Sequence, residues 1–170
     1  MRRIAAITRS PIVIALVATL AVAGCANRQT PNTAADLGLS ASGAGAATPG
    51  STQDFTVNVG DRIFFDTDSS VIRSDAQQTL RRQAQWLNQH GGYSITMEGH
   101  ADERGTREYN LALGARRAAS ARDFLIAQGV ASNRIRTISY GKERPVAVCD
   151  DISCWSQNRR GVTVLSGAGS

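Results

Sequence analysis

Apolar residues between positions 54 and 165 recur with two different periods, and this alternation limits the folds that the sequence can adopt. Some segments have the three-to-four-residue spacing of a helix with one buried face. Others have the two-residue spacing of a strand with one buried face and one solvated face. The two kinds of segment follow one another along the chain, which indicates a domain that combines helices with a sheet.

Six elements are expected in the order strand, helix, strand, helix, strand, strand. They are a strand at 63–65, a helix from 74 to about 90, a strand at 93–98, a helix at 108–128, a strand at 135–140 and a strand at 161–165. Right-handed crossovers place both helices on the same face of the sheet. The predicted fold is therefore an α+β two-layer sandwich with βαβαββ order and a mixed sheet.

Signals at the ends of these elements support the assignment. The alternation of Phe55, Val57 and Val59 favours a further strand before the first one. Ser74 and Gln77 have the spacing of a capping box at the start of the first helix. Thr106 is a candidate cap for the second helix, which is expected to end at a glycine in position 129.

The first 25 residues have the layout of a lipoprotein export signal. A basic start with Arg2, Arg3 and Arg9 leads into an uncharged apolar run at 11–23, which is shorter than the ~20 residues that a membrane-spanning helix needs. The small residues at 22–24 allow entry into a signal peptidase, and the thiol of Cys25 can carry a lipid. We expect a signal peptide at 1–24 and lipidation of Cys25; an ordinary cleaved signal with an incidental cysteine is the alternative.

Removal of the signal lowers the net charge of the protein, which changes what the charge indicates about its partners. The full chain has a net charge of +5, and loss of three arginines with the signal leaves +2. Nucleic-acid binding is not indicated, because the remaining arginines alternate with acids and lack an aromatic stacking platform. Residues 25–53, rich in Ala, Gly, Ser and Thr, are expected to form a flexible tether, which leaves one domain at 54–165 and a disordered tail at 166–170.

Two cysteines lie close together near the end of the domain. Cys149 and Cys154 flank a short polar stretch that we expect to be a loop, and in the oxidising compartment that an export signal implies they should form a disulfide. Half of a metal site is the alternative. Neither His90 nor His100 supplies the paired ligand motif that such a site needs, so no metal or other cofactor is expected.

Five motifs distributed over the folded part carry a family resemblance. They are Phe64–Asp68, Glu98–Thr106, Tyr109–Ala118, Ser139–Glu143 and Asn158–Arg160. These motifs resemble the OmpA-like peptidoglycan-binding domain, and the resemblance extends from about residue 62 to residue 165. Gly114 departs from the pattern, since many relatives have serine there.

Together with the export signal, the motifs resemble the lipid-anchored members of this family that act with the Tol proteins. The resemblance implies an outer-membrane lipoprotein whose domain faces the periplasm and binds the diaminopimelate of peptidoglycan stem peptides, in envelope integrity and cell division. Ala26 agrees with this location, because aspartate after the lipidated cysteine is the usual inner-membrane retention signal. The resemblance also implies a second partner, the periplasmic propeller protein TolB, on an overlapping surface.

The chemistry of diaminopimelate suggests which residues bind it. Its free end carries an ammonium beside a carboxylate, so a receptor needs one acid and one base held close together. Asp102 follows the second strand, and Arg117 lies in the second helix with its stem along the buried face. We expect Asp102 to bind the ammonium and Arg117 to bind the carboxylate through two parallel hydrogen bonds. A structural ion pair between the two residues is the alternative.

Four further ligand-binding positions follow from the resemblance. Asn110 either contacts the ligand or holds the loop, and Arg159 matches a position that reaches the ligand carboxylate. Asp66 and Thr67 match the first binding loop, where backbone amides are the expected contacts; an ordinary strand-to-turn sequence is the alternative. Arg160 is expected to shield the sheet edge.

Two other functions were weighed against this one. Glu98, His100, Asp102 and Glu103 lie close together at a strand end, and a pair of carboxylates can hydrolyse glycans. No serine elbow or metal-ligand set accompanies them, so the protein is predicted not to be an enzyme. The second alternative is a module whose main purpose is to dock TolB.

Overall fold

The computed structural model describes residues 47–167, so the predicted signal, Cys25 and most of the predicted tether lie outside the described residues, as do 168–170 of the tail. In chain order the elements are α2 (Thr52–Asp54), η1 (Phe55–Gly60), β1 (Arg62–Phe64), α3 (Ser74–Gln89), β2 (Ser94–His100), α4 (Arg107–Ala127), η2 (Ser132–Arg134), β3 (Ile135–Gly141), α5 (Ile152–Asn158) and β4 (Arg160–Ser166). In this part of the chain, no helix has both the length and the hydropathy to cross a bilayer.

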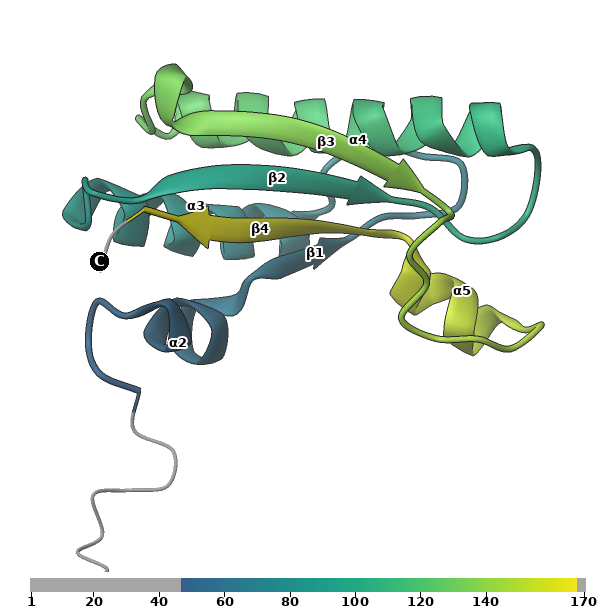
Figure 1. Ribbon diagram of the computed structural model, residues 1–170, viewed down its shortest axis with the longest axis horizontal. Helices are drawn as coiled ribbons and strands as arrows, with labels where there is room; N and C mark the ends of the chain where they lie inside the picture. Colours follow the sequence, from purple (N-terminus) through teal and green to yellow (C-terminus); the bar gives the residue numbers. More distant parts are fainter. Residues whose placement is uncertain (1–46, 168–170) are drawn as a thin grey trace, which may run out of the picture. The chain divides into compact units, whose positions relative to one another are not determined.

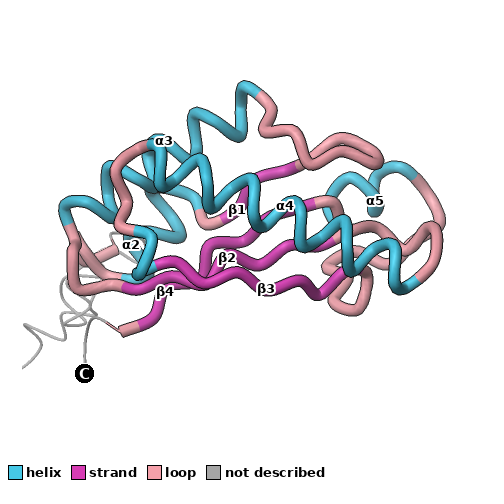
Figure 2. The backbone as a smooth tube through the Cα atoms, turned by 90° about the horizontal axis from the view of Figure 1, so that it is seen from above, coloured by secondary structure: helices cyan, strands magenta, loops and turns pink. Residues whose placement is uncertain are grey.

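A four-stranded mixed sheet forms one layer of the domain (Figure 1). Its strand order is β1-β4-β2-β3; β2 and β3 run parallel, and β4 runs antiparallel to both β1 and β2. The helices α3 and α4 lie together against one face of the sheet (Figure 2). The predicted two-layer α+β sandwich with helices on one face is therefore confirmed.

The core lies between this face and the two helices. Alternate residues of β2 point into it, as the two-residue period predicts, and the strand continues two residues past the glutamate at 98. The apolar stripe of α4 is buried at helical spacing, most completely at Ala118, Ala121 and Leu125. Leu111 is only half-buried, because it lies at the edge of the stripe.

The segment before β1 is helical, so the predicted strand at Phe55, Val57 and Val59 is wrong. Phe55 is buried and packs edge-on against Trp86 at 5.0 Å between ring centroids, whereas Val57 is 60% exposed. The carboxylate of Asp54 accepts hydrogen bonds from the Trp86 indole and from the backbone of Gly50. These contacts fasten the segment to α3, and the packed chain begins before the expected boundary at residue 54.

The predicted capping box at Ser74 is also wrong. Ser74 is the first residue of α3, Arg73 precedes the helix with an extended backbone, and no side chain caps it. The Gln77 side chain instead donates to the carbonyl of Ile72. The cap on α4 is confirmed, because the Thr106 hydroxyl accepts from the backbone N–H of Tyr109 at 3.2 Å.

The predicted disulfide is confirmed, with 5.7 Å between the Cα atoms of Cys149 and Cys154. The segment that contains it is not wholly a loop, because α5 begins at Ile152. The carboxylate of Asp151 accepts from the backbone N–H of Ser153 at 2.7 Å and caps this short helix.

Helix α4 approaches β2 with almost no side chain between the two backbones. A Cβ atom on Gly99 would collide with the carbonyl of Gly114, and a Cβ on Gly114 would collide with the hydroxyl of Ser139. Glycine at both positions therefore sets how closely the start of α4 lies to the end of β2.

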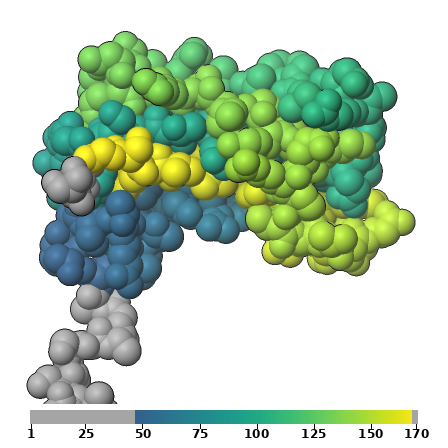
Figure 3. Space-filling model, viewed as in Figure 1, coloured from purple at the N-terminus to yellow at the C-terminus, as the bar shows by residue number. Residues whose placement is uncertain are grey.

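On the other face of the sheet, α3 and α4 are absent, and within residues 47–167 the strands β2 and β4 are largely uncovered there (Figure 2). In Figure 3 the yellow atoms of β4 are open to solvent on this face, and the green segment that follows β3 covers one end of it. His100 is buried at this end, where its ring stacks on Tyr140 and its Nε2 lies 3.2 Å from the Glu98 carboxylate. Burial and, to a lesser extent, the nearby charges of Arg160 and Arg144 lower the pKa of His100 from 6.5 to about 4.

The Gly99→Ala substitution should destabilise the domain by about 2–3 kcal/mol, because the added methyl group forces two backbones apart. Gly91→Ala is the matched control, since a Cβ there has no neighbour within 4 Å, and it should be neutral. Urea unfolding of both variants measures the difference. Equal stabilities would mean that the two elements are not in such close contact.

The low pKa of His100 should make stability depend on pH. The unfolded chain takes up a proton below pH 6.5, but folded His100 stays neutral down to about pH 4. Stability is therefore lost as the pH falls from about 6.5 to 4, by on the order of 2–3 kcal/mol from this residue. The free energy of unfolding of His100→Gln should fall less between pH 7 and pH 4.5 than that of the wild-type protein, by about this amount. An equal fall in both proteins would contradict the low pKa of His100.

Candidate functional site

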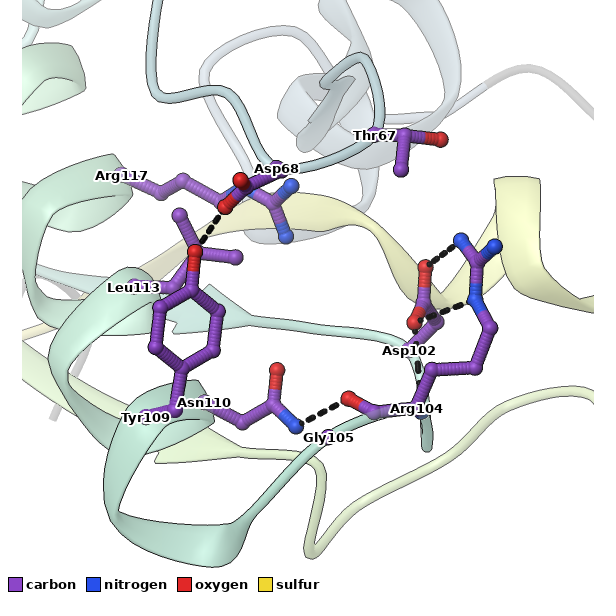
Figure 4. A pocket seen from close by; sticks show the side chains of 9 residues that line it. All are labelled: Thr67, Asp68, Asp102, Arg104, Gly105, Tyr109, Asn110, Leu113 and Arg117. Carbon is purple, nitrogen blue, oxygen red and sulfur yellow. Dashed lines mark hydrogen bonds and ion pairs between the residues drawn. The ribbon is translucent and has the colours of Figure 1, made fainter.

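A cavity of about 310 Å³ lies where three parts of the chain meet (Figure 4). Thr67 and Asp68 come from the segment after β1; Asp102, Arg104 and Gly105 come from the segment after β2; and Tyr109, Asn110, Leu113 and Arg117 come from α4. The four α4 residues share one helix face because of their spacing. The cap at Thr106 and the close packing of Gly114 fix this face relative to the strand end.

Arg117 is fully buried, and its guanidinium joins all three parts of the site. Its Nε donates to the carbonyl of Ser69 at 2.8 Å, Nη1 donates to that of His100 at 2.8 Å, and Nη2 donates to that of Asp66 at 3.0 Å. Burial lowers the pKa of Arg117 to about 10, against the opposing attraction of Asp102, so it remains charged at neutral pH.

These contacts leave part of the Arg117 guanidinium available. A guanidinium has five N–H donors, and backbone carbonyls within the described residues occupy three of them. One N–H remains on each terminal nitrogen. Two donors at a fixed separation match the two oxygens of a carboxylate, so Arg117 can bind an anion that enters the cavity.

Asp102 supplies the negative charge of the site. Arg104 holds its carboxylate through two bonds, from Nε to Oδ1 at 3.1 Å and from Nη2 to Oδ2 at 2.7 Å, and Arg159 donates to Oδ2 at 3.2 Å. Partial burial raises the pKa of Asp102, but the hydrogen bonds from Arg104 and Arg159 outweigh it and hold the pKa below its usual value. Asp102 is therefore an anion at neutral pH.

Asp102 and Arg117 line one cavity but do not pair with each other. In residues 47–167 no ion pair or hydrogen bond joins them, because Arg104 and Arg159 hold Asp102 and backbone carbonyls hold Arg117. The alternative of a structural ion pair between these two residues is therefore wrong.

The other predicted site residues lie at different depths. Thr67 and Asn110 line the cavity. Asp66 turns its carboxylate outward to Arg73 and contributes its carbonyl to Arg117. Arg159 is buried behind Asp102, with its Nε bonded to the carbonyl of Phe65, so it meets the site through Asp102.

Asn110 holds the loop that follows β2. Its Nδ2 donates to the carbonyls of Arg104 at 2.7 Å and Thr106 at 3.1 Å. Its side-chain oxygen points toward the open centre of the pocket in Figure 4 and accepts no hydrogen bond from the described residues. The amide N–H groups of Asn110 therefore hold the loop, and the amide oxygen of Asn110 remains available to a ligand.

Sequence reasoning missed the pair that closes one side of the cavity. The hydroxyl of Tyr109 donates to the carboxylate of Asp68, which links α4 to the segment after β1 (Figure 4). Asp68 takes a left-handed backbone with φ of 53°, a conformation that aspartate tolerates better than most residues. Both residues lie in the quoted family motifs, and their separation of 41 positions gave no signal that they meet.

The cluster weighed as a hydrolase site does not assemble around the cavity. Glu98 and His100 face the uncovered side of the sheet, and the Glu103 carboxylate accepts from the indole of Trp155. Of the four acidic and histidine residues in that cluster, only Asp102 lines the cavity. The site presents a fixed anion and a fixed cation, which is an arrangement for binding.

The chain is similar to proteins of a known family. Residues 64–159 match the OmpA family. The peptidoglycan-associated lipoprotein of Mesorhizobium japonicum is 79% identical over 170 residues, which span the whole of both chains.

Solved structures resemble the folded part. The crystal structure of the peptidoglycan-associated lipoprotein from Burkholderia pseudomallei has 42% identity and a TM-score of 0.61, covering 62% of this chain and 90% of that one. The C-terminal domain of Helicobacter pylori MotB has 26% identity and a TM-score of 0.59, covering 62% and 84%.

The matches extend over the expected lipid signal as well as the folded domain. They confirm the prediction of a lipoprotein that is not an enzyme. The chain belongs to the OmpA family and, within it, to the peptidoglycan-associated lipoproteins.

Proposed function

We propose that this protein holds the outer membrane to peptidoglycan by binding the diaminopimelate of stem peptides in the cavity at the end of β2. The lipid on Cys25 provides the membrane attachment, and the domain provides the attachment to the wall. The observation that carries the proposal is the unused pair of N–H donors on the buried Arg117, which faces the same cavity as the anionic Asp102.

The free end of diaminopimelate fits this pair of charges. Its carboxylate binds the two remaining donors of Arg117, its ammonium binds Asp102, and the side-chain oxygen of Asn110 accepts a further hydrogen from the ammonium. The small volume of the cavity, about 310 Å³, suits a single amino-acid headgroup and not a sugar chain. Thr67 lies on the rim with its backbone amide as an additional donor.

Attachment to the wall does not require tight binding by one domain. Peptidoglycan presents the same headgroup many times, and the lipid confines the protein to the layer beside it. A high local concentration of ligand then keeps the domain bound even when a single contact is weak.

The proposal includes action within the Tol system, with TolB as the second partner. It is supported by the resemblance of the motifs and of the full-length relatives. The apolar side chains of Val146, Val148 and Ile152 are exposed on the segment around the disulfide, next to the loop that carries Asp102. A partner that covers this segment would also limit access to the cavity.

Titration with two stem peptides tests the diaminopimelate site. A peptide that carries lysine in place of diaminopimelate has the ammonium but lacks the carboxylate, so it should bind at least tenfold more weakly, as measured by calorimetry. Asp102→Asn should weaken binding of the diaminopimelate peptide by a similar factor. Asp123→Asn is the matched control, since it removes an equal charge from an exposed ion pair with Arg122 on α4, and neither residue lines the cavity. Equal binding of both peptides would refute the site.

Arg117 needs a different substitution, because it also supports the fold. Arg117→Ala would leave three carbonyls of the site without their donor and should lower stability. Arg117→Lys keeps the charge but cannot offer the two-donor fork. It should abolish the preference for the diaminopimelate peptide over the lysine peptide, with the melting temperature recorded in parallel.

Competition between the two partners tests the overlap. Saturating diaminopimelate peptide should lower the apparent affinity of the domain for purified TolB in a pull-down titration, while the lysine peptide should not. Simultaneous binding of both partners, with neither affinity changed, would show that TolB and the peptide do not share an overlapping surface.

A further inference from the structure

The carboxylate of Asp102 has no free capacity to accept another cation. Its Oδ1 accepts from the backbone N–H and the Nε of Arg104, at 3.3 and 3.1 Å. Its Oδ2 accepts from the Nη2 of Arg104 at 2.7 Å and from the Nη1 of Arg159 at 3.2 Å. A carboxylate has about four acceptor sites, so the ammonium of a ligand can bind Asp102 only if one of these donors leaves.

Of the two arginines, only Arg104 is free to leave. The side chain of Arg159 is 8% exposed, and its Nε is bonded to the carbonyl of Phe65. The side chain of Arg104 is 42% exposed, and both of its side-chain hydrogen bonds go to Asp102. Displacement of Arg104 moves one solvated side chain, whereas displacement of Arg159 would leave a charge buried without its partner.

A second contact gives Arg104 a place to stay when it leaves Asp102. Its guanidinium carbon lies 4.2 Å from the ring centroid of Trp155, a separation at which a cation is attracted to the face of an indole. Trp155 is held in α5 next to the disulfide-bonded Cys154, and its indole nitrogen donates to Glu103. The ring therefore keeps its position while the guanidinium turns away from the carboxylate.

We propose that Arg104 is a resident counter-ion of the empty site, held between Asp102 and Trp155, and that the ammonium of the ligand must displace it from Asp102 to bind. This inference rests on the proposed function. In the empty protein, Arg104 covers the cavity side of a carboxylate whose only other charged partner among the described residues is the buried Arg159. Its displacement opposes binding, so Arg104 lowers the affinity for the ligand and favours ligands whose own cation can replace it.

The substitution Arg104→Gln tests this role. It removes the competing charge but leaves Arg159 and the backbone N–H on Asp102. Calorimetric titration with a diaminopimelate-containing stem peptide should give an affinity about three- to tenfold higher than that of the wild-type protein, the range expected for loss of a partly exposed ion pair. The melting temperature of the variant checks that the exposed substitution leaves the fold intact.

Arg107→Gln is the matched control. Arg107 lies three positions away, is exposed, and pairs with Glu143 without touching Asp102. It removes the same charge from the same end of α4, so any general effect of charge would appear in both variants. Its affinity should stay within about twofold of the wild-type value, as expected for a screened charge.

A spectroscopic measurement follows Arg104 directly. The chain has two tryptophans, and Trp86 is bonded to Asp54, whereas Trp155 contacts Arg104. Addition of the peptide to the wild-type protein should shift the indole N–H signal of Trp155 and not that of Trp86. In Arg104→Gln, the shift of the Trp155 signal should be largely lost.

The results separate this inference from the function on which it rests. Weaker binding by Arg104→Gln would make Arg104 a ligand contact, and unchanged binding would mean that it does not compete; either result overturns the proposal. Binding by neither the wild-type protein nor Arg104→Gln would refute the diaminopimelate site itself. Binding by Arg104→Gln alone would support both.

Discussion

The buried guanidinium of Arg117 is the interaction on which the site depends. A buried cation costs several kcal/mol unless hydrogen bonds replace its hydration. Here three backbone carbonyls supply them, two from the loop after β1 and one from the end of β2. The same bonds hold those segments around the cavity. Because a guanidinium has more donors than these carbonyls use, one side chain both assembles the site and offers a fork to an anion.

The position of α4 makes this possible. Two facing glycines let the helix lie against β2 at the strand end, and the cap at Thr106 starts the helix directly after the loop that carries Asp102. Residues that line the cavity thus come from a rigid helix face, while the loop is tied to the same helix by Asn110. The site is formed before a ligand arrives, which reduces the ordering that binding requires.

Asp102 is already paired with cations of the protein when the site is empty. Arg104 and Arg159 surround Asp102, and the short helix α5 places Trp155 under Arg104. An ammonium that binds Asp102 replaces an existing ion pair, so the net gain from that exchange is modest. Such a site is suited to a repeated ligand in a polymer, where many weak contacts act together.

The sequence by itself determined the fold class, the main helices and strands, and the expectation that Asp102, Asn110 and Arg117 lie together, which the structure places around one cavity. Hydrophobic periodicity reports which face of an element is buried, and the quoted motifs indicated which residues to expect in the site. It did not determine the helical segment at 55–60, because one buried Phe55 against Trp86 outweighs an alternating pattern. It also missed α5, a seven-residue helix stabilised by its cap at Asp151 and its covalent link to Cys149. The hydrogen-bond partners of Asp102 and Arg117 were decided only by the tertiary structure, because each charge bonds to whichever groups the packed loops bring within hydrogen-bond distance.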